Sequence, residues 1–392
     1  MKVEQSPTVT EVLLTDAEER SVLAACRGLS EEGYRVSAAS GRTPALTHWS
    51  RCCAARHVLP DPRVDTQAFV DALEDLLKRG RYAVLLTGSD ATLLAVSEHR
   101  ERLEAMTTLG LPSKTVVRQI LQREVVYEHA ARVGMAAPAS VVCAAAGDAA
   151  ETAHEVGFPV IVKSTRSFVP ANGGMRQLQI RMASDQTALS QIVPQFVPPF
   201  IVQRYLPGRP ILSFGGVIVA GELRALAVSQ YLRTWPADAG SASLSETILP
   251  PDGLATRVES LLRGLEWQGI FEVELLALGQ GTFSVIDVNP RPYGSMSLAL
   301  AAGANLAAIW CDCLRGRTSA LVVARPHIRY RWEDGEMLHL LSDLRHGRLG
   351  DAIAIVRPYG KVTHAQFRIS DPAPLAARSI YLGTRLLSRL RH

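Results

Sequence analysis

Residues 269–302 read GIFEVELLALGQGTFSVIDVNPRPYGSMSLALAA and contain two strand-like runs on either side of a Gln-Gly pair. The first run alternates acidic and apolar residues, and the second ends in Asn-Pro-Arg-Pro. Because side chains alternate between the two faces of a strand, Glu272 and Glu274 share one face of the first strand. Asp287 and Asn289 share one face of the second strand for the same reason. The stretch therefore predicts a β-hairpin that is followed by a loop and a helix.

A tight turn at Gln280-Gly281 would set the register of this hairpin. With a two-residue turn, Glu274 lies opposite Asp287, and Glu272 lies opposite Asn289. A three-residue loop would shift the register by one residue and separate the two polar sets, unless a β-bulge restores the parity. The position of the acids relative to one another therefore depends on the turn.

The two-residue register gathers up to three carboxylates and one amide oxygen on one patch. Clustered carboxylates repel one another and are costly to remove from water, so a bound cation should compensate them. Oxygen ligands suit Mg²⁺ or Mn²⁺, and Mg²⁺ usually takes one or two carboxylates together with substrate phosphates. The expected metal ligands are Glu272, Glu274, Asp287 and Asn289. The alternative is the solvated face of an edge hairpin.

Length and composition indicate a folded chain of two or three domains. The sequence has 392 residues, of which 47% are hydrophobic, and its net charge of +4 is too small to indicate nucleic-acid binding. Its apolar runs are shorter than the about 18 residues that a membrane-spanning helix needs, and its first residues lack a signal-peptide pattern. Six cysteines occur without the spacing of a zinc site, which favours a reduced, cytoplasmic location.

Strand-like and helix-like segments alternate at the start of the chain. Strands are expected at residues 9–14, 34–39 and 83–86, and helices at 17–32 and 69–79. This alternation predicts an open parallel sheet with flanking helices over residues 1–112. Ligands tend to bind beyond the carboxyl ends of such strands, so Thr87–Asp90 is a candidate substrate loop. A plain helix N-cap would use the same residues.

The segment Asp287–Arg291, preceded by an acid on the neighbouring strand, resembles the metal-binding hairpin of the ATP-grasp superfamily. The similarity is greatest to its carboxylate–amine ligase branch, with the ATP-binding domains of biotin carboxylase and carbamoyl phosphate synthetase as relatives. The resemblance covers nearly the whole chain and implies an α/β fold. It implies an N-terminal domain at 1–112, a small lobe at 113–203, a large lobe with the metal hairpin at 204–320, and a C-terminal extension at 321–392.

The resemblance also implies which residues hold ATP. Lys163 ends a buried strand where the family places a lysine on the nucleotide phosphates, and Arg123 stands where the family usually has another lysine. The loop 164–174, with Gly173 and Gly174, resembles the segment that covers the phosphates. The implied adenine hinge consists of Gln203, Arg204, Tyr205 and Leu206. The alternative for Lys163 is a surface lysine, and the alternative for Arg123 is a solvated helix arginine. The two glycines would otherwise form a hairpin turn, and the hinge residues would form a plain linker between the lobes.

Two further arginines are implied to act on the reacting groups. Arg291 and Lys163 would neutralise charge on the transferring phosphoryl group, and Arg233 would contact a phosphate or a substrate carboxylate. Residues 293–295 would line the pocket of the second substrate. A helix over residues 298–314 is then expected to close the lobe.

The C-terminal segment from residue 376 is basic, and Leu382, Leu386 and Leu390 recur at every fourth position. Such a basic amphipathic helix can lie on an anionic membrane or dock on its own protein or on a second subunit. Membrane contact through this segment and a homodimer are therefore open possibilities.

The resemblance implies an ATP-dependent carboxylate–amine ligase that joins small amino-acid-like substrates through an acyl phosphate, with ATP and Mg²⁺ or Mn²⁺ as cofactors. One alternative keeps the site and forms a carbamoyl or carboxyphosphate product. Another is a nucleotide-binding sensor or scaffold without turnover, which the arginines at positions 123 and 204 keep open. The expected partners are a small carboxylate and a small amine.

Overall fold

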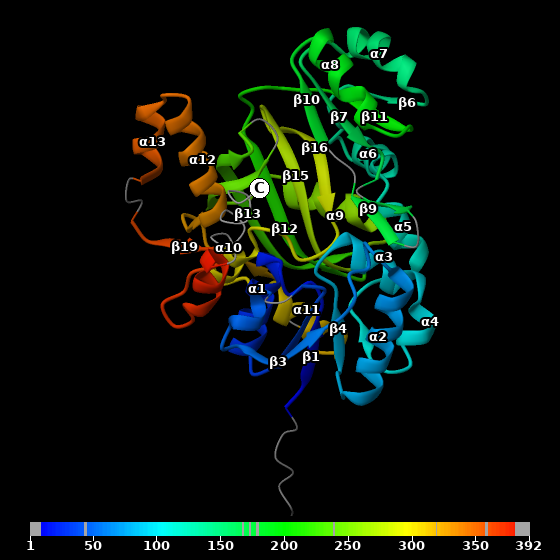
Figure 1. Cartoon of the computed structure of the whole chain (residues 1–392), viewed down its shortest axis with the longest axis vertical. Coiled ribbons are helices and arrows are strands. Elements are labelled where there is room, and N and C mark those ends of the chain that lie inside the picture. Colours follow the sequence, from blue (N-terminus) through cyan, green and yellow to red (C-terminus); the bar gives the residue numbers. More distant parts are fainter. Residues whose placement is uncertain are drawn as a thin grey trace, which may run out of the picture.

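The computed structural model describes residues 9–42, 45–166, 168–171, 174–177, 180–237, 240–318, 320–356 and 360–380. Gly173 and the tail from residue 381 lie outside these ranges. Figure 1 shows the N-terminal domain in blue at the bottom, a large sheet in the middle and a small lobe at the upper right. The fold is of the predicted mixed α/β class, and the large sheet lies between the other two parts.

The N-terminal domain contains a parallel sheet, as predicted, and its strand order is β3-β2-β1-β4-β5. The strands are β1 Glu11–Leu14, β2 Arg35–Ser40, β3 Cys53–Val58, β4 Val84–Leu86 and β5 Thr108–Leu109. The helices are α1 Arg20–Glu31, α2 Thr66–Arg79, α3 Asp90–Glu98 and α4 Arg100–Leu103. Leu13 and Leu85 pack on the side of α2 and α3, whereas Val12 and Leu14 pack on the side of α1. The alternating apolar strands are therefore covered on both faces.

The small lobe is an antiparallel sheet with the strand order β10-β7-β11-β6. Its strands are β6 Ser140–Cys143, β7 Val160–Ser164, β10 Ile180–Ala183 and β11 Phe200–Arg204. Its helices are α7 Ala149–Val156 and α8 Gln186–Ile192, and α5 Lys114–Ile120 and α6 Arg123–Arg132 precede them. A two-stranded hairpin of β8 Phe168–Ala171 and β9 Gly174–Gln177 extends from this lobe.

The large sheet has the order β16-β15-β12-β13-β14-β18-β19, with β17 paired to β13. Its strands are β12 Ile211–Val219, β13 Glu222–Trp235, β14 Ser241–Ile248, β15 Gly269–Gly279, β16 Thr282–Asn289, β17 Val322–Val323, β18 Arg329–Arg331 and β19 Val362–His364. Helix α9 Leu254–Gly264 packs on the face that carries Phe271, Val273 and Leu275. Because faces alternate along a strand, Glu272 and Glu274 of β15 point to the opposite face.

The single helix expected over residues 298–314 is wrong, because the structure has two helices there. They are α10 Met296–Ala301 and α11 Leu306–Leu314. Gly303 adopts a φ of 96°, which ends the first helix, and the side chain of Asn305 accepts a bond from the Ala308 N–H to cap the second. Continuous helical periodicity in the sequence concealed this break.

The C-terminal region carries α12 Glu333–Arg345 and α13 Leu349–Val356, which Figure 1 shows in orange beside the large sheet. The segment after β19 returns to the N-terminal domain, where Asp371 forms a buried ion pair with Arg27 of α1 at 2.9 Å. Among the described residues, no helix is long and apolar enough to cross a bilayer. All six cysteines are described, and they are free thiols.

Candidate active site

The hairpin of β15 and β16 has the predicted register. Glu272 pairs with Asn289, and Glu274 pairs with Asp287. The turn residues Gln280 and Gly281 have φ values of 50° and 71°, as a two-residue turn of type I′ requires. The hairpin contains two register shifts, one close to the turn and one directly beyond Glu274. These shifts compensate each other, so the parity that the turn sets is restored at the acids.

The second register shift leaves Ile286 without a ladder partner, and this frees its backbone carbonyl. The Ile286 oxygen accepts hydrogen bonds from Tyr127 Oη at 3.0 Å and from Lys163 Nζ at 3.1 Å. The ammonium group of Lys163 also lies 5.1 Å from the centre of the Tyr127 ring, within the range of a cation–π contact. The bulge therefore fixes Lys163, at the end of β7, against the strand that carries Asp287.

The two glutamates are held by hydroxyl and amide donors. Glu272 is buried, and its carboxylate accepts from Ser213 Oγ at 2.5 Å and from Asn289 Nδ2 at 2.9 Å. Glu274 accepts from Tyr231 Oη at 2.6 Å. These neutral donors orient the carboxylates without neutralising them.

The electrostatics of this patch suit a bound cation next to a bound anion. Burial, together with the neighbouring Glu272 and Asp287, raises the pKa of Glu274 to about 8. Burial and the nearby Arg123 lower the pKa of Lys163 to about 7. An anion beside Lys163 and a cation beside Glu274 would each favour the charged form of its neighbour, which is the charge pattern of a nucleotide phosphate with its metal ion.

The described residues contain no group of three or more His, Cys, Asp or Glu side chains that could hold a metal ion alone. The hairpin instead offers Glu274 and Asp287, with the amide oxygen of Asn289 beside them. This donor set fits Mg²⁺, which usually combines one or two carboxylates with water and substrate phosphate oxygens.

Two predicted arginines connect this hairpin to other parts of the chain. Arg123 Nε lies 3.4 Å from Asp287 Oδ1, and its Nη1 donates to the Ser164 carbonyl at 2.9 Å. Arg291 Nε donates to Asp90 Oδ1 at 2.6 Å, and its Nη2 donates to Asn289 Oδ1 at 3.0 Å. Arg123 thus joins the hairpin to the small lobe, and Arg291 joins it to the N-terminal domain.

An apolar cavity of about 130 Å³ lies between the small lobe and the large sheet. The predicted hinge residues line it, together with Lys163, Glu274 and Asp287: they are Gln203, Arg204, Tyr205 and Leu206. The backbone N–H groups of Arg204 and Tyr205 already donate to Ala139 and Pro159. Gln203 is buried, and its Nε2 has no hydrogen-bond partner among the described residues. This amide is therefore a ready donor for a ligand in the cavity.

A second, polar cavity of about 380 Å³ adjoins the first. Tyr231, Glu274 and Asp287 line both cavities, so the carboxylates form a shared wall. Glu272, Asn289, Arg123 and Arg291 also line the larger cavity. Its far side is formed by the N-terminal domain, including Gly88, Ser89 and Asp90 of the predicted substrate loop. The structure therefore brings this loop to the metal hairpin.

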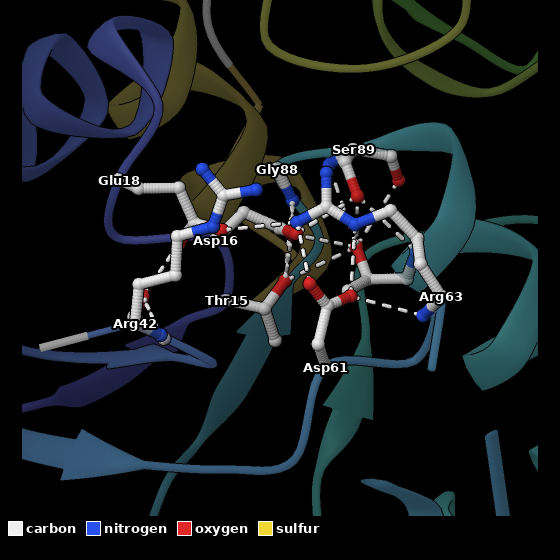
Figure 2. A network of polar contacts seen from close by, with 10 residues as sticks. Thr15, Asp16, Glu18, Arg42, Asp61, Arg63, Gly88 and Ser89 are labelled. Atoms are coloured by element: carbon white, nitrogen blue, oxygen red, sulfur yellow. Dashed lines mark hydrogen bonds and ion pairs between the residues drawn. The ribbon is translucent and has the colours of Figure 1, made fainter. Parts of the chain in front are cut away.

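The loops that follow β1 and β4 are held together by Asp16, which Figure 2 shows at the centre of a polar network. Asp16 has a φ of 59°, a conformation that costs energy for a residue other than glycine. Its buried carboxylate accepts from Gly88 N at 3.0 Å, from Ser89 Oγ at 2.8 Å and from Thr92 Oγ1 at 2.6 Å. These bonds offset the strain and fix the loop that enters the larger cavity.

The β8–β9 hairpin, which contains part of the predicted covering loop, contacts the N-terminal domain. A Cβ atom placed on Gly174 would lie 2.2 Å from the carbonyl oxygen of Arg63. Arg63 itself lines the larger cavity and is held by Asp61, with Nε donating to Oδ1 at 2.8 Å. Glycine at position 174 therefore allows the hairpin to approach the far wall of the cavity. Gly173, the other predicted glycine, lies outside the described residues.

Arg233 is placed differently from the other predicted residues. It forms an ion pair with Glu336 of α12, with Nη1 at 2.5 Å from Oε2, and it lines neither of the two cavities. A β-bulge in β13 lies between Tyr231 and Arg233. Tyr231 and Arg20 were not among the predicted site residues, because only their tertiary positions bring them to the larger cavity. The substrate role of Arg233 stays a prediction.

The fold and the site together define a class of protein. Neither models of known families nor curated protein sequences match this chain. Among solved structures, however, it resembles enzymes of the ATP-grasp class, and the chain therefore has the ATP-grasp fold, as the sequence motif implied.

Three solved structures illustrate the likeness. The L-amino acid ligase from Bacillus licheniformis is 14% identical over 78% of this chain and 74% of its own, with a TM-score of 0.58. The N5-carboxyaminoimidazole synthetase from Staphylococcus aureus, complexed with ADP, is 12% identical over 82% and 80%, with a TM-score of 0.62. The biotin carboxylase domain of the Hydrogenobacter thermophilus 2-oxoglutarate carboxylase is 15% identical over 82% and 73%, with a TM-score of 0.62.

Proposed function

We propose that this protein is an ATP-dependent ligase that joins a carboxylate to an amine. The observation that carries this proposal is the wall of carboxylates shared by two adjoining cavities. The smaller cavity has the apolar lining and hinge strand that suit a nucleotide, and the larger has the charged lining that suits polar substrates. The S. aureus structure named above contains ADP, and the H. thermophilus structure contains MgADP.

Each part of the site has a role in this proposal. Glu274 and Asp287 would hold Mg²⁺, with Asn289 and Glu272 completing or orienting the set. The ion supplies neutralising charge to the phosphates when it is bound. The base would lie in the smaller cavity beside Gln203, and Lys163 and Arg123 would contact the phosphates. A nucleotide bound in this way places its terminal phosphate at the boundary between the cavities.

The chemistry that this arrangement serves has two steps. An oxygen of the substrate carboxylate attacks the terminal phosphorus of ATP, the bond to the bridging oxygen breaks, and an acyl phosphate and ADP result. The amine then attacks the acyl carbon, the carbon–oxygen bond to phosphate breaks, and the nitrogen loses a proton to give the amide and inorganic phosphate. Lys163 and Arg291 would stabilise the negative charge on the transferring group, so positioning and electrostatics carry the reaction.

The acyl phosphate hydrolyses readily, so water must be kept from it. The β8–β9 hairpin is the element we assign to this task, because its Gly174 packs against the backbone of Arg63 at the far wall of the larger cavity. Closure of this kind also commits the bound substrates to reaction.

A second candidate function keeps the nucleotide site and changes the acceptor. The H. thermophilus structure contains bicarbonate, and a chain with the same fold could phosphorylate bicarbonate to carboxyphosphate. A nucleotide sensor without turnover is the third candidate, because Arg123 stands where the family usually has a lysine. The finer assignments, including small amino-acid-like substrates, a homodimer and a cytoplasmic location, belong to this proposal as well.

A substrate screen that measures ADP release tests the proposal. The full chain is incubated with ATP, Mg²⁺ and pairs drawn from a panel of carboxylic acids and amines, and products are identified by mass spectrometry. The expected result is ADP release that needs both an acid and an amine, with a product that has lost one water. ADP release that needs only bicarbonate would favour carboxyphosphate formation, and nucleotide binding without turnover would favour the sensor.

A further inference from the structure

The reaction scheme does not use the C-terminal helices α12 and α13. These helices pack against each other, and Figure 1 shows them side by side in orange, with α13 on the outside of the molecule. Residues 333–356, which contain both helices and the loop between them, are called the C-terminal helix pair below. All of these residues are described, and none of them lines either cavity of the site.

Helix α12 buries charged side chains rather than apolar ones. Its buried residues are Gly335, Glu336 and Asp343. Glu336 pairs with Arg233, and Asp343 pairs with Arg348 at 2.7 Å. A helix that packs on a protein normally turns its apolar face inward, so the opposite arrangement indicates that the outer face of α12 meets an apolar partner.

Each helix of the pair carries a stripe of large apolar side chains on its exposed side. Within each stripe the residues follow the i, i+4, i+7 spacing, which places them on one side of a helix. The exposed fraction of these residues is 44–63%. They are Met337, Leu341 and Leu344, with Leu338 beside them, on α12, and Leu349, Ile353 and Val356 on α13. A single exposed apolar residue is ordinary, whereas a set of this size on two packed helices marks a binding surface.

The charges of the C-terminal helix pair suit an anionic partner. Residues 345–348 join the two helices at an exposed tip, and Arg345 makes no ion pair with any described residue. Four of the five acids of the pair keep at most 17% of the side chain exposed, and Asp351 is the exception. The surface that carries the stripes is therefore apolar, with cations at the tip and most acids turned inward.

The basic C-terminal segment of the chain begins beside the same helix. Nε of Arg378 donates to Oδ2 of Asp334 in α12 at 2.9 Å, and Ile380, the last described residue, is 66% exposed. Residues 381–392 lie outside the described ranges, and their sequence contains three arginines, one histidine and no acid. Twelve residues can span up to about 40 Å, and α12 is about 20 Å long. The arginines of this segment can therefore reach any point along α12.

We infer that the C-terminal helix pair and the basic segment after it bind an anionic lipid bilayer. The apolar stripes enter the boundary between headgroups and acyl chains, and the arginines stay among the anionic headgroups. Either signal alone gives weak, reversible attachment, and the two together hold the protein at the surface. This inference goes beyond the proposed ligase function and does not depend on it.

Two other occupants of the apolar stripes fit these observations less well. A second copy of the chain would bring two basic segments together, and like charges repel. Residues 381–392 of the same chain would bring their arginines to acids that already have partners, such as Glu336 and Asp343. A lipid surface satisfies the apolar stripes and the arginines at once.

Flotation of the full chain with lipid vesicles tests this inference. One set of vesicles is phosphatidylcholine alone, and the other contains phosphatidylglycerol as about a third of the lipid. The variants are the double substitution Leu341→Glu with Ile353→Glu, and a chain that ends at residue 380. The matched control is Leu249→Glu with Leu321→Glu, two exposed leucines outside the helix pair. Circular dichroism checks the fold of each variant, and light scattering measures its oligomeric state.

The wild type should float with the anionic vesicles and bind phosphatidylcholine at least about tenfold more weakly, and salt raised from about 0.1 M to about 0.5 M should weaken the binding. The double variant and the shortened chain should each lose at least about tenfold in binding, with no change in the control.

No flotation of the wild type, equal binding to both kinds of vesicle, or unchanged binding in the double variant would overturn the inference. Stronger flotation of the shortened chain would show that residues 381–392 cover the helix pair. A dimer that the double variant dissociates, without vesicle binding, would assign the surface to a second copy. Each of these last two results would overturn the inference as well.

Discussion

A substitution at Lys163 tests the proposed nucleotide binding more directly than a change at any other single residue of the site. It is buried, and apart from the Ile286 carbonyl and the Tyr127 ring it faces a cavity rather than a carboxylate partner. Burial and the nearby Arg123 lower the pKa of this amine more than Asp287 and Glu274 raise it. A phosphate group would supply compensating charge.

Lys163→Met should therefore weaken ADP binding by roughly ten- to hundredfold, because a charge-assisted contact is lost. Calorimetric titration of the full chain with ADP measures this change. The control is Lys78→Met, which removes an exposed helical pair with Glu74 and should leave the affinity unchanged. Equal ADP affinity in the wild type and Lys163→Met would show that Lys163 does not bind the nucleotide and has a structural role only.

Glu274→Gln should abolish Mg²⁺-dependent ADP release, with a loss of at least about a hundredfold, since a metal-binding carboxylate becomes a neutral amide. The fold should persist, because the amide oxygen can still accept from Tyr231. Steady-state kinetics and circular dichroism check the two parts. Glu222→Gln, which alters an exposed pair with Arg224 in the same sheet, is the matched control. Wild-type rates in Glu274→Gln would discard the metal assignment.

Single residues of the site differed in how far the sequence could predict them. The register of Glu272 and Glu274 with Asn289 and Asp287 followed from strand parity and a Gln-Gly turn, which are local rules. Arg20 reaches Gly294 and Trp332, which are more than 270 positions away in the chain. No local pattern encodes such contacts, so the position of Arg20 could only be found in three dimensions.

At the scale of elements, the β8–β9 hairpin brings the small lobe against the N-terminal domain at Arg63, a residue of the larger cavity's wall. Its role depends on close backbone approach at Gly174. The sequence predicted a covering loop here from its resemblance to the phosphate-covering segment of the ATP-grasp superfamily, but it could not predict which surface the loop would meet.

Gly174→Ala should displace this hairpin, because the added methyl group would overlap the Arg63 carbonyl. We expect the acyl phosphate to be exposed to water, so the ratio of ADP released to amide formed should rise well above one. Parallel assays of both products measure this ratio. Gly147→Ala is the control, since a Cβ at Gly147 meets open space and its φ is not positive. A ratio of one in Gly174→Ala would show that the hairpin does not protect the acyl phosphate from water.

At the scale of the whole molecule, the chain closes on itself through the segment after β19. Burial alone would raise the pKa of Asp371, but bonds from Ser50 Oγ and the Arg51 N–H, together with Arg27, hold it below its usual value. The buried partner in α1 was not predicted, because the two residues are 344 positions apart.

Asp371→Asn should lower the free energy of unfolding by about 3–5 kcal/mol, because it leaves Arg27 buried without its counter-charge. Since the folded pKa lies below the unfolded value of about 3.9, this stabilisation is complete above about pH 4 and is lost as the pH falls through the folded pKa. Urea unfolding between pH 3 and pH 7 measures both effects. Glu31→Gln, which affects an exposed pair with Arg368, is the control. A decrease of less than about 1 kcal/mol in the free energy of unfolding at pH 7 would contradict the stabilising role given to the Asp371–Arg27 ion pair.

Across the whole molecule, local sequence patterns predicted some parts of the fold and missed others. Strand alternation and apolar periodicity predicted the parallel N-terminal sheet and the metal hairpin. They missed the division of residues 298–314 into α10 and α11, because the break depends on Gly303 and on the cap at Asn305. They also could not place Arg233, whose ion pair with Glu336 depends on the packing of α12 against the sheet.

The central claim is that β15 and β16 turn their carboxylates toward one divalent ion that holds a nucleotide between the lobes. Crystals of the full chain grown with Mn²⁺ and ADP, with anomalous scattering recorded at the manganese edge, test it most directly. The predicted result is a manganese peak within coordinating distance of Glu274 and Asp287, with ADP phosphates bound to the same ion and the adenine beside Gln203. A nucleotide bound elsewhere, or a manganese ion that touches neither carboxylate, would contradict the account.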